Sequence, residues 1–325
     1  MTPPLTYISA SDVRRVLTPE IAVRLAESAL LRQAEGRVTW STPRLMAVAP
    51  ATTSRRYMAK GCVLDEHTAG FRAGSVDRAL SEEEPPGGPT LLTLICDATT
   101  GQFLAIIDEE WQHAMRTGAA AAVAARYCAP PGPQVVAVIG AGKVAGPTVE
   151  ALRVVFDKPE IRISSRRKES REALAQALGP DVKALPVDAA LEGATVVITA
   201  TTAKAPIVDM RSLEPGAFVY AMGDGQEVSD DVYRHADVVM ADDWEQCTTR
   251  RDIARLVAEG VIDPASVVSL WELVGGIRPG RLRDSDILVM RSQGLVIQDV
   301  AIGRYVYDEC TRAGLGSTLG PAADA

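Results

Sequence analysis

A glycine-rich turn near the middle of the chain constrains the fold more than any other feature. The apolar residues 135–139 predict a strand, the turn after them reads G-x-G-x-x-A, and residues 143–156 predict a helix. In such a turn the first glycine permits a tight bend, the second lets the backbone approach a pyrophosphate, and the small third residue keeps the helix close to the sheet. The candidate phosphate-binding residues are Gly140, Gly142, Lys143, Val144 and Ala145.

A tight turn that binds nothing would have the same local pattern, so the flanking elements decide between the two interpretations. Strands are predicted at 160–164, 195–200, 217–222 and 238–241, with helical segments between them such as 169–178. Buried strands that alternate with helices are typical of a parallel sheet covered on both faces. The predicted fold class is α/β, with a Rossmann-type doubly wound parallel sheet and the glycine turn as a dinucleotide site.

The N-terminal part of the chain has a different character. Residues 11–36 predict helix, with a second helix start available at Thr18-Pro19-Glu20. Short apolar stretches separated by Gly, Pro, Thr and Asp then predict antiparallel strands. These stretches cover 44–49, 57–64, 90–97 and 102–108, with a loop at 85–89. The result is a second, α+β domain.

The domain boundaries follow from two further helices. An alanine-rich helix is predicted from residue 117 and a final helix over 297–311. We therefore expect residues 1–116 plus 297–325 to form a substrate-binding and dimerisation domain, and residues 117–296 to form the nucleotide-binding domain.

The choice between the two nicotinamide dinucleotides depends on the end of the strand at 160–164. An NAD-binding sheet usually carries an acidic residue there to accept a hydrogen bond from the ribose. This chain has Ser164, Ser165, Arg166 and Arg167 instead, and guanidinium groups favour a 2′-phosphate. We predict NADP(H), with NAD(H) as the alternative. A solvated basic turn would have the same residues. On the nicotinamide side we expect Thr199, Ala200, Thr201, Met222 and Gly223.

Composition excludes several classes of partner. The net charge is −8 and no dense basic run occurs, so nucleic acid and anionic membrane surfaces are poor partners. No apolar run approaches the ~20 residues of a membrane span. The five cysteines are scattered, which is typical of reduced thiols in a cytoplasmic protein, and the three histidines lack metal-ligand spacing. The acidic run 242–245 is interpreted as a helix cap and solvated face.

A family resemblance is carried by motifs along nearly the whole chain. They are TPRL (42–45), YMAKG (57–61), CDATTGQFLAIID (96–108), MRTGAAAAVAA (115–125), VIGAGKVAG (138–146), ITATT (198–202), AMGD (221–224), WELVGGIRPGR (271–281) and GLVIQDVA (294–301). In their order and spacing the chain resembles the ornithine cyclodeaminase/mu-crystallin family. That family contains cyclodeaminases, ketimine reductases, alanine-type and opine-like dehydrogenases and a hormone-binding crystallin, so the resemblance implies the fold more narrowly than the reaction.

The resemblance implies roles for four residues. Arg44, Lys60 and Arg116 match the carboxylate-binding cations of the family, and Lys60 is also a catalytic candidate. Asp224 matches an acid at a strand end that could transfer a proton to the imine nitrogen or hold an ammonium. Taken singly, each of the cations would be expected in a surface salt bridge instead.

Two segments depart from the usual family pattern. The loop GDGQEVSDD (223–231) is short and lacks the Pro-Gly-Lys that many members carry, which puts recognition of the amine in doubt. The segment 61–75 is also atypical. His67 and Arg72 within it could contact a substrate side chain, although a loop histidine is more often a surface residue.

The preferred function is an NADP-dependent reductase or dehydrogenase of a small α-imino acid or amino acid, with hydride transfer at the carbon that bears nitrogen. One alternative is an ornithine or lysine cyclodeaminase, an ammonia lyase that recycles NAD. Another is a non-catalytic binder of NADPH and a small ligand. A homodimer is expected because an antiparallel N-terminal sheet would otherwise expose its edges.

Overall fold

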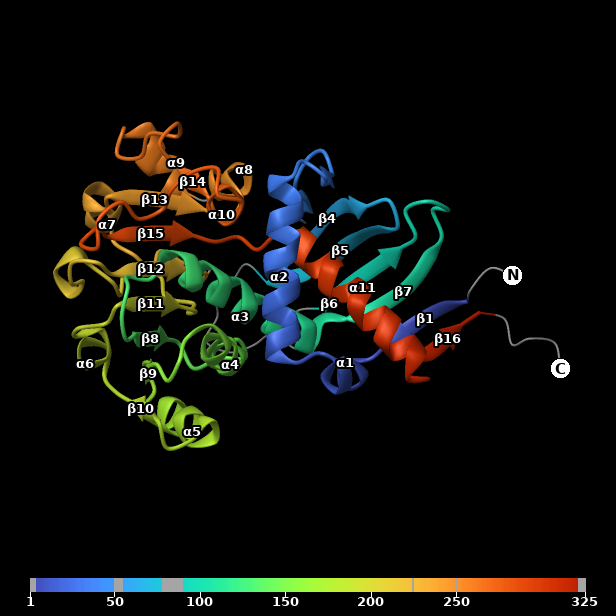
Figure 1. Cartoon of the computed structure of the whole chain (residues 1–325), viewed down its shortest axis with the longest axis horizontal. Coiled ribbons are helices and arrows are strands. Elements are labelled where there is room, and N and C mark those ends of the chain that lie inside the picture. The colour runs from blue at the N-terminus through green and yellow to red at the C-terminus, as the bar shows by residue number, and fades with distance from the viewer. Residues whose placement is uncertain (1–3, 50–54, 78–89, 224, 250, 321–325) are drawn as a thin grey trace. The chain divides into compact units, whose positions relative to one another are not determined.

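The computed structural model describes residues 4–49, 55–77, 90–223, 225–249 and 251–320 (Figure 1). The chain divides into two compact units. Unit 1 contains Met1–Arg116 and Leu295–Ala325, and unit 2 contains Thr117–Gly294. Helix α3 (Glu109–Cys128) contributes its first part to unit 1 and the rest to unit 2. Leu295 and Val296, expected in the nucleotide-binding domain, belong to unit 1.

Unit 2 is built on a parallel sheet. Its strands are β8 (Val135–Ile139), β9 (Glu160–Ser164), β10 (Val182–Ala184), β11 (Val196–Thr199), β12 (Phe218–Ala221), β13 (Val238–Ala241), β14 (Val268–Ser269) and β15 (Leu288–Arg291). They are ordered β10-β9-β8-β11-β12-β15-β13-β14, and each neighbouring pair is parallel. The order reverses direction between β8 and β11, which confirms the predicted Rossmann-type architecture.

Helices cover both faces of this sheet. They are α4 (Ala145–Val155), α5 (Lys168–Leu178), α6 (Val187–Leu191), α7 (Asp230–His235), α8 (Trp244–Cys247), α9 (Arg251–Ala258), α10 (Leu270–Val274) and the 3-10 turn Met210–Ser212. One face, with Ile139, Val197 and Val219, packs on α6, α7 and α9 in a common apolar core. The residues that alternate with these along each strand point to the other face of the sheet. On that face the sulfur of Cys128 in α3 lies 3.6 Å from the sulfur of Met240.

The alanine-rich part of α3 packs closely on the start of α4. A Cβ added at Gly118 would lie 2.7 Å from the backbone nitrogen of Thr148 and 2.8 Å from Pro147. Only a residue without a side chain allows these two backbones to approach so closely. The small residues of 117–125 therefore serve helix packing beside the glycine turn.

Unit 1 is built on a mixed sheet. Its strands are β1 (Leu5–Ile8), β2 (Thr39–Trp40), β3 (Met46–Val48), β4 (Arg55–Asp65), β5 (Thr68–Asp77), β6 (Thr90–Cys96), β7 (Phe103–Asp108) and β16 (Ser317–Leu319). The order is β16-β1-β7-β6-β5-β4-β2, with β3 also paired to β4; β1 and β7 run parallel and the remaining pairs antiparallel. The predicted α+β domain is confirmed.

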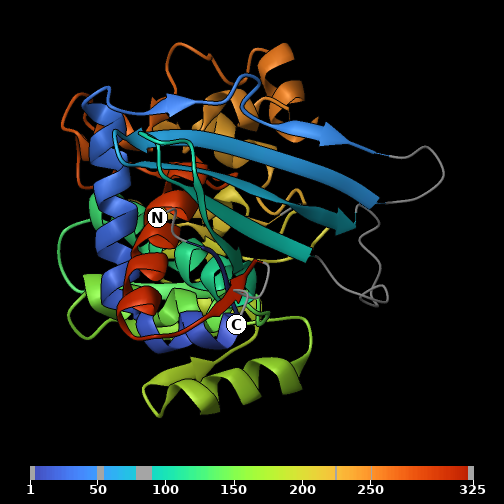
Figure 2. The ribbon, with the colours of Figure 1, turned by 90° about the vertical axis from the view of Figure 1, so that its right-hand side faces the viewer.

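Besides the first part of α3, the described residues of unit 1 form the helices α1 (Ala10–Val16), α2 (Pro19–Ala34) and α11 (Val296–Arg312). Helix α11 contacts β4, β5, β6 and α2, and Figures 1 and 2 show α2 and α11 beside the same face of the strands. At Gly70 a Cβ would lie 2.9 Å from a methyl group of Val300, so α11 sits directly on β5. The opposite face carries exposed apolar side chains, among them Tyr57 and Phe71.

Several predicted elements differ from those observed. The helix predicted over 11–36 is broken at Leu17, and α3 begins at Glu109 rather than at residue 117. Strand β5 was not predicted because Gly70 and Gly74 weaken its pattern. Strand β15 was not predicted either, although it lies between β12 and β13. The loop expected at 85–89 lies outside the described residues.

Candidate active site

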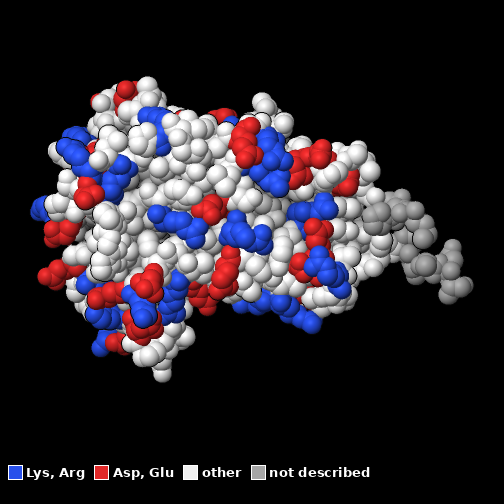
Figure 3. Space-filling model, viewed as in Figure 1, with Lys and Arg blue, Asp and Glu red and all other residues white. Residues whose placement is uncertain are grey.

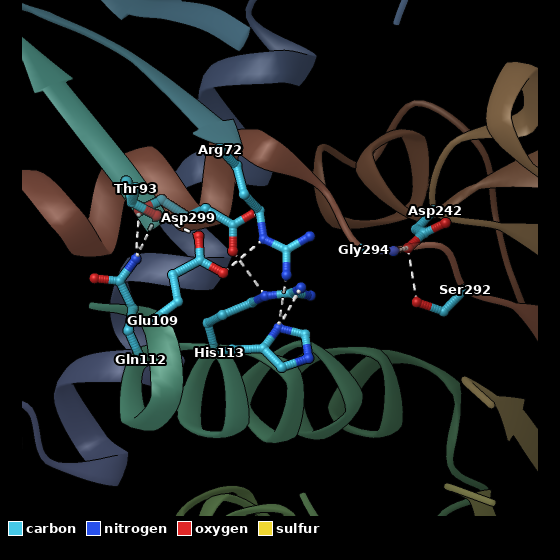
Figure 4. Close-up of polar contacts among 10 residues, drawn as sticks. Arg72, Thr93, Glu109, Gln112, His113, Asp242, Ser292, Gly294 and Asp299 are labelled. Atoms are coloured by element: carbon cyan, nitrogen blue, oxygen red, sulfur yellow. Dashed lines mark hydrogen bonds and ion pairs between the residues drawn. The ribbon is translucent and has the colours of Figure 1, made fainter. Parts of the chain in front are cut away.

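A buried group of charged side chains gathers in unit 1, and we call it the charged cluster. It consists of Lys60, Arg72, Glu109, His113, Arg116 and Asp299. Lys60 and Arg72 are direct cross-strand partners on β4 and β5, so their side chains point to the same face. The α3 members recur at helical spacing, and Asp299 comes from the first turn of α11. Figure 4 shows Arg72, Glu109, His113 and Asp299 converging.

Opposite charges balance most of this cluster. Arg72 Nε lies 2.7 Å from Glu109 Oε2 and 3.8 Å from Asp299 Oδ2, and Arg116 Nε lies 2.7 Å from Asp299 Oδ1. The exposed fractions of Lys60, Arg72 and Arg116 are 7%, 7% and 4%. Two cations side by side on neighbouring strands would repel. The two carboxylates on the facing helices offset that repulsion.

Glu109 accepts hydrogen bonds at both carboxyl oxygens. Gln112 donates to the Thr93 hydroxyl at 3.1 Å, and that hydroxyl in turn donates to Glu109 Oε1. Arg72 Nε donates to the other oxygen. The pKa of Glu109 is raised, because the effect of burial exceeds the lowering by the charge of Arg72. Since both oxygens accept, we assign the ionised form.

His113 lies among the cations of the cluster. Its Nδ1 is 2.9 Å from Arg116 Nη2 and 3.2 Å from Arg72 Nη2. Burial, together with the charges of Arg116, Arg72 and Lys60, holds the pKa of His113 well below its usual range. With a neutral imidazole, three cations and two carboxylates, the cluster sums to one positive charge, which suits an anionic ligand.

The other two predicted substrate residues of unit 1 have different surroundings. The guanidinium group of Arg44 lies over the ring of Trp40, 4.0 Å from its centroid, as a cation–π pair. His67 lies in the turn between β4 and β5 with 68% of its side chain exposed, 3.5 Å from Glu66. The structure thus brings Lys60 and Arg116 together in one cluster. His67 lies at the surface, as is more common for a loop histidine.

Sequence reasoning missed three members of the cluster, Glu109, His113 and Asp299. The signal was present in the first two, because residues 109, 112, 113 and 116 fall on one side of a helix. It was overlooked because the helix was expected to begin at residue 117. Asp299 stood within GLVIQDVA, but no charge partner could be assigned to it from sequence.

The glycine turn of unit 2 has the geometry that a phosphate site needs. Gly140 has φ +131°, and a Cβ on it would lie 2.3 Å from the carbonyl oxygen of Ala200. At Gly142 a Cβ would meet no heavy atom within 4 Å, so its backbone borders open space. No side chain caps the first turn of α4, which begins after Val144. A dinucleotide pyrophosphate fits these features.

The turn after β9 presents its basic side chains outward. Ser164 is buried, and its carbonyl oxygen accepts from the Gly140 N–H at 2.8 Å. Ser165 Oγ donates to the Arg167 carbonyl at 2.8 Å, and Arg171 donates to the Ser165 carbonyl at 2.9 Å. Arg166, Arg167 and Lys143 are exposed. The turn is fixed by hydrogen bonds while its guanidinium groups remain at the surface.

Glu227 connects the ends of β11 and β12. One oxygen accepts from Thr199 Oγ1 and from the Gly223 N–H, and the other accepts from the N–H and hydroxyl of Thr201, each at 2.7 Å. Arg291 donates to the Gly223 carbonyl at 2.8 Å. The hydroxyl groups of Thr199 and Thr201 therefore donate hydrogen bonds to Glu227. The sequence did not suggest this structural role for them. Met222 begins this loop, and Asp224 lies outside the described residues.

Asp242 has a different environment from the one predicted. The run 242–245 does cap α8 through Asp243, but Asp242 and Asp243 are only 5% and 8% exposed, so the expected solvated face is wrong for them. Asp242 accepts from the Ser292 hydroxyl and from the Gly294 N–H, both at 2.7 Å (Figure 4). It thereby fixes the segment that leads out of unit 2.

The parallel sheet, its reversal point and the glycine turn define a Rossmann-type α/β protein. Beyond that class, the chain belongs to the ornithine cyclodeaminase/mu-crystallin family, whose profile matches residues 7–314. An alanine dehydrogenase from Archaeoglobus fulgidus is 32% identical over 243 residues, which cover 72% of this chain and 75% of that protein. The ketimine reductase mu-crystallin of Macropus fuliginosus is 30% identical over 221 residues, covering 66% and 68%.

A solved structure agrees over nearly the full length. An archaeal alanine dehydrogenase dimer with bound NAD superposes with a TM-score of 0.89 at 25% identity, covering 98% of this chain and 99% of that one. Within the described residues, no helix combines the length and apolar character needed to cross a membrane.

Proposed function

We propose that this protein is an NADP(H)-dependent oxidoreductase that reduces the carbon–nitrogen double bond of a small α-imino acid to give an L-amino acid. Relatives named alanine dehydrogenase and ketimine reductase support an oxidoreductase that acts on C=N or CH–NH groups. The choice of an α-imino acid as substrate is inferred from the charged cluster, which is a buried cationic site in a family whose relatives act on amino or imino acids.

The cluster binds the substrate carboxylate. Lys60 and Arg116 provide the charge, and the Arg116 guanidinium is held by an ion pair with Asp299 and by a hydrogen bond from Nη2 to His113. Arg72 adds a third cation held by Glu109. A carboxylate bound by such fixed donors has one orientation, so the neighbouring imine carbon is presented in a defined direction. Arg44 and His67 are expected at the margin of this site, with Arg44 held by Trp40.

The dinucleotide is held by unit 2. The backbone at Gly140, Gly142, Lys143, Val144 and Ala145 binds the pyrophosphate, and Ser165, Arg166 and Arg167 bind a 2′-phosphate. When bound, the nicotinamide ring supplies or accepts the hydride. Ala200, Thr201, Met222 and Gly223 border it through their backbone. NADP(H) is favoured over NAD(H) because the β9 turn offers exposed guanidinium groups and no carboxylate.

Asp224 supplies the proton that the imine nitrogen gains, with Lys60 as the second candidate. The support comes from the neighbours of Asp224. Gly223 is held on its N–H by Glu227 and on its carbonyl by Arg291. A Cβ on Gly223 would lie 2.3 Å from the Thr201 carbonyl oxygen, so this part of the loop has little freedom. A proton donor needs such a fixed approach.

The cyclodeaminase alternative is less well supported. Ornithine and lysine carry a distal ammonium group, which a buried site must meet with a carboxylate. The two carboxylates of the charged cluster, Glu109 and Asp299, already face arginines. A reductase substrate without a distal cation fits this balance better. A non-catalytic binder of the crystallin type has no specific support from the described residues.

A homodimer is proposed from the open face of the unit 1 sheet. Gly61, Phe71, Leu94 and Ile106 follow one another across β4, β5, β6 and β7 on the face opposite Lys60 and Arg72. Phe71 is 46% exposed there. An apolar sheet face of this kind is typical of an interface. A cytoplasmic location is also proposed, since the five cysteines are free and buried.

The test is NADPH oxidation, followed by absorbance, with a panel of cyclic imino acids and of 2-oxo acids supplied with ammonia or amines. NADH runs in parallel, as do ornithine and lysine with NAD. We expect turnover of NADPH with an imino acid, reduced at least about 100-fold in Asp224→Asn, the loss typical of a general acid. Ammonia release from ornithine or lysine, with no imine reduction, would assign the protein to the cyclodeaminases instead.

A further inference from the structure

We propose that His113 is a positioning residue of the substrate site: as a neutral imidazole protonated at Nε2, it holds the guanidinium groups of Arg72 and Arg116 in place for an anionic substrate. This inference rests on the proposed function for the identity of the substrate. It rests on the geometry of the cluster alone for the state of the ring.

The protonation state follows from hydrogen-bond chemistry. Nδ1 of His113 is within hydrogen-bond distance of Arg116 Nη2 and Arg72 Nη2, at 2.9 and 3.2 Å. A guanidinium group can only donate, so Nδ1 must accept from both and cannot carry a proton. The ring proton is therefore on Nε2. A proton on Nδ1 would point an N–H at two other N–H groups.

The surroundings of the ring favour the same state. Lys60 on β4, Arg72 on β5 and Arg116 on α3 are cations, and Glu109 on α3 and Asp299 on α11 are the anions. Both anions already face arginines. Protonation of His113 would place a fourth cation among three in a buried site, which is costly.

His113 affects the orientation of the Arg116 guanidinium group. Asp299 forms an ion pair with Arg116, 2.7 Å from Nε and without hydrogen-bond geometry, whereas Nη2 donates to His113 Nδ1 at 2.9 Å. An ion pair alone leaves a guanidinium group able to rotate, so the directional bond to His113 sets its plane. His113 also adds a second link between Arg116 and Arg72, two like charges that Asp299 already joins as ion pairs. The substrate carboxylate then meets donors that are already in position.

The first experiment separates the acceptor atom from the rest of the ring. His113→Asn keeps an acceptor oxygen near the position of Nδ1, while His113→Leu removes the acceptor and keeps the bulk. The probe is Δ1-pyrroline-2-carboxylate with NADPH, and the exposed His235→Leu is the matched control. We expect His113→Leu to raise KM about tenfold, the loss of one hydrogen bond to a charged group, with kcat within about twofold. His113→Asn should restore KM to within about threefold.

An unchanged KM in His113→Leu would overturn the proposal, and so would an Asn variant as impaired as the Leu variant. If the wild type shows no turnover with this probe, the same comparison uses the dissociation constant of pyrrole-2-carboxylate, a planar analogue that cannot be reduced in this way. Binding that is lost in His113→Leu and kept in His113→Asn would support the positioning role. Equal binding by all three proteins would overturn it.

The second experiment reads the ring directly and needs no substrate. In protein labelled with 15N-histidine, the signals that disappear in His113→Asn identify His113. We expect an unprotonated Nδ1 and a protonated Nε2 at pH 7. A proton on Nδ1, or on both nitrogens, would overturn the proposed state. Failure of imine reduction while His113 has the expected state would instead count against the proposed function alone.

Discussion

The five charged side chains buried in unit 1 are not explained by stability. Each ion loses several kcal/mol of hydration on burial, and networks of this kind can often be replaced by apolar residues without loss. Here Lys60, Arg72 and Arg116 are each less than a tenth exposed, and the cluster as described contains three cations and two carboxylates. A chain that keeps such residues in place of an apolar core gains something other than stability. An anion-binding site is the simplest gain.

A single substitution tests the cofactor prediction. Arg166→Ala removes one exposed guanidinium group from the turn after β9 but leaves the hydrogen bonds that fix the turn, which involve Ser165, Arg167 and Arg171. We expect kcat/KM for NADPH to fall about 10- to 100-fold, the range of a charge-assisted hydrogen bond, with little change for NADH. Steady-state kinetics with both cofactors measure this. Lys183→Ala, which removes another exposed cation from β10, is the control.

Equal losses with the two cofactors would contradict the assignment of this turn to the 2′-phosphate. Such a result would not bear on the pyrophosphate site proposed at Gly140 and Gly142, because that proposal relies on backbone groups.

The low pKa of His113 predicts a pH dependence of stability. In the unfolded chain the ring takes up a proton near pH 6.5, while in the folded protein it stays neutral to lower pH. The unfolded state therefore binds more protons below about pH 6.5, and the free energy of unfolding falls by up to about 1.4 kcal/mol per pH unit from this group. The fall ends at the folded pKa of the ring.

Denaturant titrations at pH 7.5 and 5.5 measure the effect, as the difference between the two values for each protein. Wild type should lose about 1 kcal/mol more than His113→Asn over this interval. His235→Asn, on the exposed side of α7, is the matched control and should lose as much as wild type. Parallel losses in wild type and His113→Asn would show that His113 is not held neutral.

At the scale of elements, the close contact of α3 with α4 gives the clearest prediction. Gly118→Val would place a Cβ 2.7 Å from the Thr148 backbone nitrogen, and backbone cannot move aside as a side chain end can. We expect a loss of about 1–3 kcal/mol in the free energy of unfolding, measured by denaturant titration. Gly146→Ala, on α4 itself, is the control. Its Cβ would meet Leu174 Cδ1 at an ordinary 3.6 Å, so stability should be kept or slightly raised. Equal effects of both substitutions would contradict the packing argument.

Elements with a strong period were predictable, and those defined by their neighbours were not. Strands β8, β9 and β13 were predicted with the observed bounds because each is a short apolar run next to a turn signal. Strand β5 was missed since its glycines serve contacts with Leu94 and Val300, which sequence alone does not reveal. Strand β15 was overlooked although residues 287–290 also form a short apolar run, and its insertion beside β12 is a long-range pairing that sequence alone does not reveal.

The same distinction applies to the candidate site. Lys60 and Arg116 were predicted through family motifs, and they do lie in one cluster. The role of Thr199 as a partner of buried Glu227 was not predictable, because their hydrogen bond spans 28 positions in the chain. His113 was missed for a local reason, since the start of α3 was placed too late.

At the scale of the whole molecule, several site residues lie close in sequence to the two points where the chain crosses from one unit to the other. The chain leaves unit 1 after Arg116 and returns at Leu295, and Asp299 follows within the first turn of α11. Both members of the Arg116–Asp299 ion pair therefore lie within a few residues of such a crossing point. The return segment is fixed by Asp242 through Ser292 and Gly294. On the face in Figure 3, Lys and Arg are interspersed with Asp and Glu, so that surface offers no extended basic area.

The open apolar face of unit 1 gives the prediction for assembly. Phe71 lies near the middle of this face, and its ring covers Gly61, where a Cβ would come within 2.6 Å of it. Its neighbours across the sheet are Leu94 and, one strand further, Ile106. Since Phe71 is 46% exposed in the single chain, its full burial would stabilise an interface by roughly half of the ~1.5–3 kcal/mol that a fully exposed phenylalanine contributes.

Light scattering should therefore give wild type twice the 34.5 kDa chain mass, and Phe71→Glu should shift it toward one chain mass at low micromolar concentration. A charge on this face would have to be buried in the dimer without a partner, which costs more than the lost apolar contact. Glu66→Gln, at the exposed turn beyond β4, should leave the mass unchanged. Because α11 and the charged cluster occupy the opposite face, Phe71→Glu should keep its thermal unfolding cooperative. A wild type with one chain mass, or a Phe71→Glu variant that stays at twice that mass, would place the interface elsewhere or remove it.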